Sequence, residues 1–172
     1  MLKLDLARLE RQKKLRVDAE IPSDDPLWEG ADLAFQGPLR VGLDAQSTVD
    51  GGVVVRGSIE GTLAFECRRC LDPVEWSVDR DLTLVWTPVD ELGVTEDDGD
   101  CRVLANSATE VDLGAAIREE LILGTDRYRV CDSACRGLCP KCGTNLNVEA
   151  CDCTVDELDP RWDVLRTLKT EG

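Results

Sequence analysis

The amino-acid sequence predicts an α+β protein, in which an antiparallel β-meander sheet carries a few short helices and a cysteine-rich C-terminal segment packs against the sheet. Three segments predict the sheet: in residues 33–46, 53–67 and 74–86, apolar side chains recur at every second position. This period is typical of strands that bury one face. The C-terminal segment is predicted by the crowding of cysteines after residue 130.

Short connections between the three segments support the meander. The links at residues 47–52 and 68–73 contain the turn pairs Asp-Gly and Asp-Pro, and strands joined by such short links pair antiparallel. Because Pro38 has no backbone N–H, we expect the first strand to lie at an edge of the sheet. Arg80 interrupts the apolar face of the third strand.

A helix is predicted after the sheet. Residues 88–100 are acidic and nearly free of large apolar side chains, which predicts a loop, and residues 102–104 could add a short strand. Thr109 and Asp112 have the spacing of a capping box, which predicts a helix over about residues 112–123. The apolar stripe of this helix consists of Leu113, Ala116, Ile117 and Leu121.

The two ends of the chain show weaker patterns. The pair Asp159-Pro160 predicts a short C-terminal helix. Residues 2–6 alternate like a strand, whereas residues 6–15 could instead form a helix. We therefore expect a β-rich sheet domain over residues 1–130, and a cysteine-rich segment with the C-terminal helix over residues 131–172 that is integrated with it.

Composition limits the classes of function. The formal net charge is −15 and the pI is about 4.3, whereas proteins that coat nucleic acid usually present a basic face. A chain this acidic can attract a basic partner protein, or its charge can simply keep it soluble. The chain contains no histidine, which excludes a Ser/His/Asp triad and a Cys/His nucleophile pair. We expect a protein that is not an enzyme.

The sequence gives no sign of export or of a membrane segment. The first residues, MLKLDL, lack the apolar core of a signal peptide, and the chain has no run of 18 apolar residues. We therefore expect a cytoplasmic protein. In a reducing compartment, many cysteines indicate bound metal before they indicate disulfides.

Eight of the nine cysteines fall into close groups. Residues 67–70 read CRRC, residues 131–142 read CDSACRGLCPKC, and residues 151–153 read CDC. Zn²⁺ prefers four thiolates in a tetrahedron, and a Cys-x-x-Cys turn brings two of them to one ion. We predict structural Zn²⁺ bound by Cys67, Cys70, Cys131, Cys135, Cys139, Cys142, Cys151 and Cys153.

Two arrangements of these ligands remain open. The preferred one places Cys67, Cys70, Cys131 and Cys135 around one Zn²⁺ and the other four around a second. The alternative pairs only the two Cys-x-x-Cys turns, as in a zinc ribbon. Redox chemistry, disulfides and catalytic zinc fit less well, because neither a βαβ pattern, an export signal nor an open coordination position is evident. Cys101 is expected to be a small buried apolar residue.

Four stretches occur in the order CRRCLDPVEW, EVDLGAAIREELILG, CDSACRGLCPKCGTNLNVEACDC and DPRWDVLRTL. Together they resemble the YceD family, the large ribosomal RNA subunit accumulation proteins, over roughly residues 30–168. Residues 135–147 form the most specific part. The resemblance implies a bacterial or plastid protein needed for normal amounts of large-subunit ribosomal RNA, without an established enzyme activity.

The resemblance thus implies a ribosome-biogenesis factor that binds large-subunit rRNA, a pre-ribosomal particle or a basic ribosomal protein, with no membrane and no small-molecule substrate. Basic side chains near the cysteines could contact such a partner or only offset thiolate charge: Arg68, Arg69, Arg127, Arg129, Arg136 and Lys141. A thiol redox or zinc-sensing protein is the alternative function. A nuclease is a third, but no recognisable carboxylate site for Mg²⁺ is present.

Overall fold

The computed structural model describes residues 2–89, 101–126 and 128–154, and its contacts divide the chain into two compact units. The sheet unit comprises residues 1–65 and 73–128, and the cysteine unit comprises residues 66–72 and 129–172. The first Cys-x-x-Cys turn thus belongs to the same unit as the later cysteines. The predicted C-terminal helix and nearly all of the predicted acidic loop lie outside the described residues.

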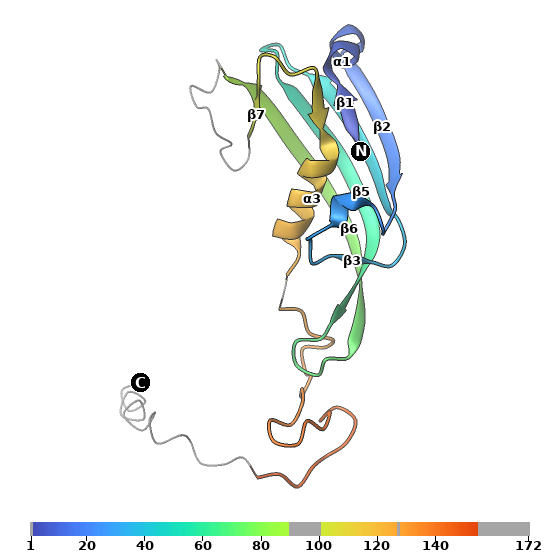
Figure 1. Cartoon of the computed structure of the whole chain (residues 1–172), viewed down its shortest axis with the longest axis vertical. Helices are drawn as coiled ribbons and strands as arrows, with labels where there is room; N and C mark the ends of the chain where they lie inside the picture. Colours follow the sequence, from blue (N-terminus) through green and yellow to red (C-terminus); the bar gives the residue numbers. More distant parts are fainter. Residues whose placement is uncertain (1, 90–100, 127, 155–172) are drawn as a thin grey trace, which may run out of the picture. The chain divides into compact units, whose positions relative to one another are not determined.

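The sheet unit contains one main sheet and a smaller ribbon (Figure 1). The main sheet has the order β2-β4-β5-β6-β7, with β3 paired to β5, and β1 pairs with β8 in the ribbon. The pairs β2–β4, β4–β5 and β3–β5 are antiparallel, whereas β7 runs parallel to β6. The predicted antiparallel-rich α+β fold is confirmed. In chain order the elements are β1 (Lys3–Asp5), α1 (Leu6–Gln12), β2 (Lys14–Ile21), the 3-10 helix η1 (Pro26–Trp28), β3 (Ala34–Phe35), β4 (Leu39–Ser47), β5 (Val53–Glu66), β6 (Pro73–Pro88), β7 (Arg102–Leu104), β8 (Glu110–Asp112) and α3 (Leu113–Gly124).

One face of the main sheet faces the core and the other faces water. Along β4, buried side chains alternate with exposed or half-buried ones, as the period of two predicts. The stripe of α3 joins the same apolar cluster, as does Leu9 of α1. Residues that are fully buried in this core include Leu39, Leu43, Val55, Ile59, Leu84, Leu113, Ile117 and Leu121.

The first predicted strand is interrupted, and its predicted edge position is wrong. Gly37 has a φ of +107°, a left-handed conformation that favours glycine, and it separates β3 from β4. Pro38 lies in this break, so it removes no hydrogen bond from β4. β4 pairs with both β2 and β5, so β2, a strand that the sequence analysis did not predict, lies at the edge instead.

Helix α3 begins one residue later than predicted and has a different cap. Asp112 Oδ1 accepts a hydrogen bond from the Ala115 N–H at 3.1 Å. The prediction that Thr109 begins a capping box is wrong, because residues 110–112 pair with β1 and stay extended up to the start of α3. Arg80 also contacts this helix: its Nη1 donates to the carbonyl of Glu120 at 3.3 Å. The contact lies near the C-terminal end of α3, where the helix dipole makes a positive charge favourable.

The N-terminal residues adopt both of the structures that their pattern allowed. β1 is followed directly by α1, whose first turn is capped by the Asp5 carboxylate, 2.8 Å from the Arg8 N–H. Within the described ranges, no helix has the length and the apolar character needed to cross a membrane.

Candidate metal centres

The first Cys-x-x-Cys turn, residues 67–70, follows β5. The Cys67 N–H donates to the carbonyl of Asp72 at 2.9 Å, and the Leu71 N–H donates to the carbonyl of Cys67 at 2.9 Å. These two bonds close the turn and direct both sulfurs to one side. The Arg69 N–H lies 3.4 Å from Cys67 Sγ, so a backbone donor faces the first sulfur.

The second turn, residues 139–142, has the same backbone hydrogen bonds. The Cys139 N–H donates to Thr144 O at 2.8 Å, and the Gly143 N–H donates to Cys139 O at 2.9 Å. Gly143 and Leu71 occupy equivalent positions, with φ values of +74° and +62°. Glycine tolerates this conformation, whereas a leucine there is strained by roughly 1–2 kcal/mol. The side chain of Leu71 is 56% exposed, so packing does not offset that strain.

Thiol cluster 1 consists of Cys67, Cys70, Cys131 and Cys135, whose sulfurs all lie within 4.8 Å of one another. Cys67 Sγ is 3.8 Å from Cys135 Sγ, and Cys70 Sγ is 3.6 Å from Cys131 Sγ. A tetrahedral zinc site with Zn–S bonds of about 2.3 Å places its sulfurs about 3.8 Å apart. The geometry of this cluster therefore fits a four-thiolate zinc site.

Thiol cluster 2 consists of Cys139, Cys142, Cys151 and Cys153, again with all sulfurs within 4.8 Å. The structure thus groups the eight cysteines as in the preferred arrangement, and the two Cys-x-x-Cys turns belong to different clusters. Binding of Zn²⁺ by these groups stays a prediction. Cys101 is half-buried and lies in neither cluster.

The donor set supports a metal-thiolate role for cluster 1. Besides the Arg69 N–H, the Cys131 N–H lies 3.3 Å from Cys67 Sγ, and Asn147 Nδ2 lies 3.3 Å from Cys135 Sγ. Such N–H donors stabilise negative charge on sulfur and orient the ligands. Four soft thiolates in a tetrahedron are the donor set that suits zinc.

The thiols of cluster 1 differ in acidity. Burial opposes ionisation of Cys67, but backbone N–H groups, including those of Cys70 and Cys131, lower its pKa to about 6. At Cys70 the Asp72 backbone N–H favours the thiolate, yet burial and the neighbouring thiols raise the pKa. Without metal, this cluster therefore retains protons that a bound cation has to displace.

Cluster 2 shows the same division. The Thr144 hydroxyl, 3.2 Å from Cys142 Sγ, lowers the pKa of Cys142 to about 6. The hydrogen bond with Cys142, together with burial and Cys139, raises the pKa of Cys153 to about 12. Both clusters thus pair readily ionised thiols with reluctant ones, as expected where four thiols crowd together and cannot all ionise freely.

The basic side chains near the cysteines have different roles. Arg69 Nη1 donates to the carbonyls of Cys135 at 3.0 Å and Ser133 at 3.3 Å, and the Leu138 N–H donates to Arg69 O at 2.9 Å. Arg69 therefore connects the first turn to residues 133–138 within the cysteine unit, a structural role in addition to any contact with a partner. Of the other candidates, Arg127 lies outside the described residues, Arg129 is half-buried, and the exposed ones are Arg68, Arg136 and Lys141.

Two asparagines that sequence reasoning did not single out support the clusters. Asn145 Nδ2 donates to Asp72 Oδ2 at 2.8 Å, which ties the loop after the second turn to the first turn. Asn147 Oδ1 accepts from the Arg136 N–H at 2.7 Å, while its Nδ2 faces Cys135. Both belong to the Asn-Leu-Asn sequence at the end of residues 135–147, the most specific part of the family resemblance. That sequence could have indicated that the two asparagines matter to the clusters.

The fold and the two clusters define a β-sheet protein with two four-thiol groups suited to zinc. A family model described as large ribosomal RNA subunit accumulation protein YceD matches residues 55–169. The chain belongs to the YceD family, as its sequence motifs indicated.

Relatives of the chain occur in actinobacteria and in a plant. An uncharacterized protein of Mycobacterium tuberculosis H37Rv is 32% identical over 164 residues, which cover 92% of this chain and 77% of that protein. One from Mycobacterium leprae is 31% identical over 151 residues, covering 81% and 67%. The chloroplastic large ribosomal RNA subunit accumulation protein YCED homolog 1 of Arabidopsis thaliana is 29% identical over 140 residues, covering 67% of this chain and 44% of that protein. No solved structure shows a significant match.

Proposed function

We propose that this chain is a cytoplasmic, non-catalytic ribosome-biogenesis factor that supports the accumulation or processing of large-subunit ribosomal RNA. The observation that carries the proposal is the family match over residues 55–169, which includes most of β5, all of β6 and α3, and all eight clustered cysteines. The name of the plant relative points in the same direction.

In this proposal the two clusters bind Zn²⁺ as structural ions. A structural zinc contributes apparent binding free energy of about 10–16 kcal/mol, which becomes folding free energy when the site forms only on folding. Cluster 1 joins residues 67–70 to residues 131–135, so metal there stabilises a long-range connection within the cysteine unit. Four thiolates fill a tetrahedral zinc, which leaves no position for a substrate or a catalytic water.

The charges of the cysteine unit favour a protein partner over naked RNA. Residues 66–72 and 129–154 contain five Lys/Arg and five Asp/Glu, so their fixed charges balance. A four-thiolate zinc site carries a net charge of −2, which makes the loaded unit acidic. Among rRNA, a pre-ribosomal particle and a basic ribosomal protein, this balance favours the protein surface.

The test is depletion with matched complementation. Deleting the gene in its native host should lower large-subunit rRNA relative to small-subunit rRNA, measured on gels and by sedimentation of cell extracts. The wild type and a Cys101→Ser variant should restore the ratio, whereas Cys70→Ser, which removes a cluster thiol, should not. An unchanged rRNA ratio after deletion would refute the proposed role.

A thiol redox or zinc-sensing protein is the second candidate, favoured by the exposure of Cys142 and Cys153 in cluster 2. In that case these thiols would change state in oxidant-treated cells before the bulk of cellular thiols does. Trapping thiols with an alkylating reagent and reading the modified peptides by mass spectrometry tests this directly. Cysteines that stay metal-protected under oxidant would dispose of the candidate.

A further inference from the structure

An apolar cleft of about 540 Å³ lies within the sheet unit, whereas both thiol clusters belong to the cysteine unit. It is formed by the end of the edge strand β2, by η1, and by the junction of the ribbon with α3. The residues that line it are Leu2, Ala19, Glu20, Ile21, Asp25, Pro26, Leu27, Asp112 and Gly114.

The wall of this cleft is aliphatic and continuous with the core. Ile21 is buried, and Leu2 and Leu27 are partly buried residues that pack against the core cluster. Gly114 brings the start of α3 close to the same space, since a Cβ there would lie 3.5 Å from Leu27 Cδ1. The volume falls within the range of roughly 300–1,000 Å³ in which proteins bind compact ligand groups.

The cleft is acidic as well as apolar. Three carboxylates, from Glu20, Asp25 and Asp112, line it, and none of its described lining residues is a lysine or arginine. Two of them are held in place by capping bonds: Asp25 accepts from the Leu27 N–H at 2.8 Å, and Asp112 accepts from Ala115. Glu20 is exposed and 3.5 Å from Arg40, a pair that water screens and a competing cation can replace.

The surrounding charge favours a cationic occupant. Over its described residues the sheet unit contains 19 Asp/Glu and 11 Lys/Arg, a net charge of −8. Such a field attracts basic segments and repels phosphate backbones.

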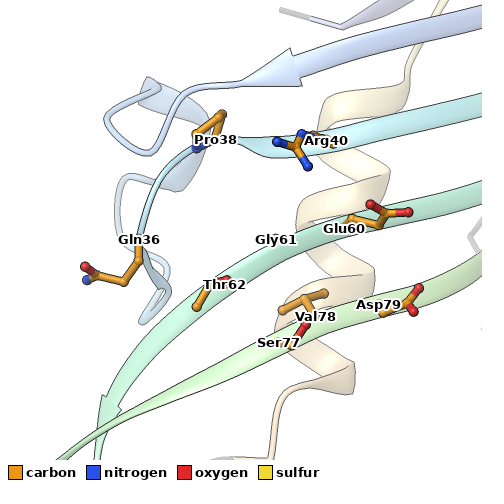
Figure 2. Close-up of a pocket in the computed structure, with 9 residues that line it drawn as sticks. All are labelled: Gln36, Pro38, Arg40, Glu60, Gly61, Thr62, Ser77, Val78 and Asp79. Atoms are coloured by element: carbon orange, nitrogen blue, oxygen red, sulfur yellow. The ribbon is translucent and has the colours of Figure 1, made fainter.

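A second depression in the same unit lacks this combination. It has a volume of about 340 Å³ and lies on the water-facing side of the main sheet. In Figure 2, Arg40, Glu60 and Asp79 project from three adjacent strands along it. It mixes both charge signs and offers little apolar surface, and only its Arg40 end reaches Glu20. Asp79 on β6 lies three strands away from Glu20 on β2, so it serves as the control position.

We propose that the apolar cleft binds a lysine- and arginine-rich segment of a partner protein, which inserts one aliphatic side chain against Leu2, Ile21 and Leu27. The flanking cations of the segment face the carboxylates of Glu20, Asp25 and Asp112. The identity of the partner rests on the proposed function: if that function holds, the segment belongs to a basic ribosomal protein. The binding itself depends only on the cleft.

The test uses the full-length, zinc-loaded protein and two fluorescein-labelled peptides, KRKLKRK and KRKSKRK, which have the same charge. Fluorescence anisotropy should show that the leucine peptide binds roughly tenfold tighter or more, since only it buries an aliphatic side chain. An RNA oligonucleotide of similar length should bind more weakly than either peptide.

Two charge reversals of equal size separate the cleft from general electrostatics. Glu20→Lys should weaken binding of the leucine peptide about three- to tenfold, as expected when an exposed attraction becomes a repulsion. Asp79→Lys, at the control position, should change it less than about twofold. Equal affinity for both peptides, equal weakening by both substitutions, or tighter binding of the RNA would each overturn the proposal.

Failure of this proposal can be told apart from failure of the proposed function. If the peptides bind without preference but deletion of the gene still lowers large-subunit rRNA, only the cleft proposal falls. If the leucine preference and the Glu20→Lys effect appear while rRNA is unchanged by deletion, the cleft binds basic segments outside ribosome assembly.

Discussion

Replacing Asn147 with alanine should loosen metal binding at cluster 1 and leave cluster 2 nearly unchanged. The amide of Asn147 makes three bonds in the cysteine unit: Nδ2 lies 3.3 Å from Cys135 Sγ and 2.9 Å from Asn145 Oδ1, and Oδ1 accepts from the Arg136 N–H at 2.7 Å. Alanine removes all three. The Cys135 sulfur then loses a charge-stabilising donor, and the backbone beside it loses its fixed position.

The expected magnitude follows from these contacts. Removing a group that orients a metal ligand weakens metal binding by roughly 10- to 100-fold, or about 1.4–2.7 kcal/mol. Asn147 is exposed, so water can replace part of what is lost, and we expect the lower end, about tenfold.

Competition with a chromophoric zinc chelator measures this change for each site, and Co²⁺ substitution gives an independent reading through thiolate–cobalt absorption. Asn106→Ala makes the same chemical change in the sheet unit and is the control. Equal loss at both clusters, or no change at either, would refute the reasoning that Asn147 acts through Cys135.

Further predictions concern strain, exposure and protonation. Leu71→Gly should raise the free energy of unfolding in urea by about 0.5–1 kcal/mol, because relief of the left-handed strain exceeds the entropy cost of glycine; a lower value would contradict this. Arg80→Met should lower it by about 1 kcal/mol through loss of the bond to the end of α3, whereas Arg56→Met, on the exposed face of β5, should have little effect. A chelator should remove zinc in two phases, cluster 2 first, because more of its thiols are exposed; alkylation and mass spectrometry identify the order, and simultaneous release would argue against it. Zinc should be released as pH falls, most steeply below about 6, where even Cys67 and Cys142 take up protons: the metal-free form binds more protons, so acid favours it. Zinc retention in dialysis from pH 7 to 5 measures this, and full retention at pH 5 would contradict it.

Local patterns predicted the parts of the fold that depend on local physics. The period-two alternation predicted β4, β5 and β6, because burial of one face requires it. The same alternation continues at Leu15, Val17, Ala19 and Ile21 in β2, a strand that was not predicted. The error at Thr109 has another cause: the pairing of β8 with β1 links residues more than 100 positions apart, and no local signal reports it.

The candidate site was predicted to a similar degree. Spacing alone indicated which cysteines could share a metal, since a Cys-x-x-Cys turn has one compact geometry. It left two groupings open, because the choice depends on how residues 67–70 meet residues 131–135 in space. The roles of Arg69 and Asn147 were beyond sequence reasoning, since their bonds to Cys135 depend on that same meeting.

Zinc content per chain, measured by elemental analysis on protein purified without added metal or chelator, tests the structural account most directly. Two four-thiolate clusters predict two zinc ions per chain, falling to one in a Cys70→Ser variant and staying at two in Cys101→Ser. One ion in the wild type, or none, would contradict the claim that both clusters are metal sites.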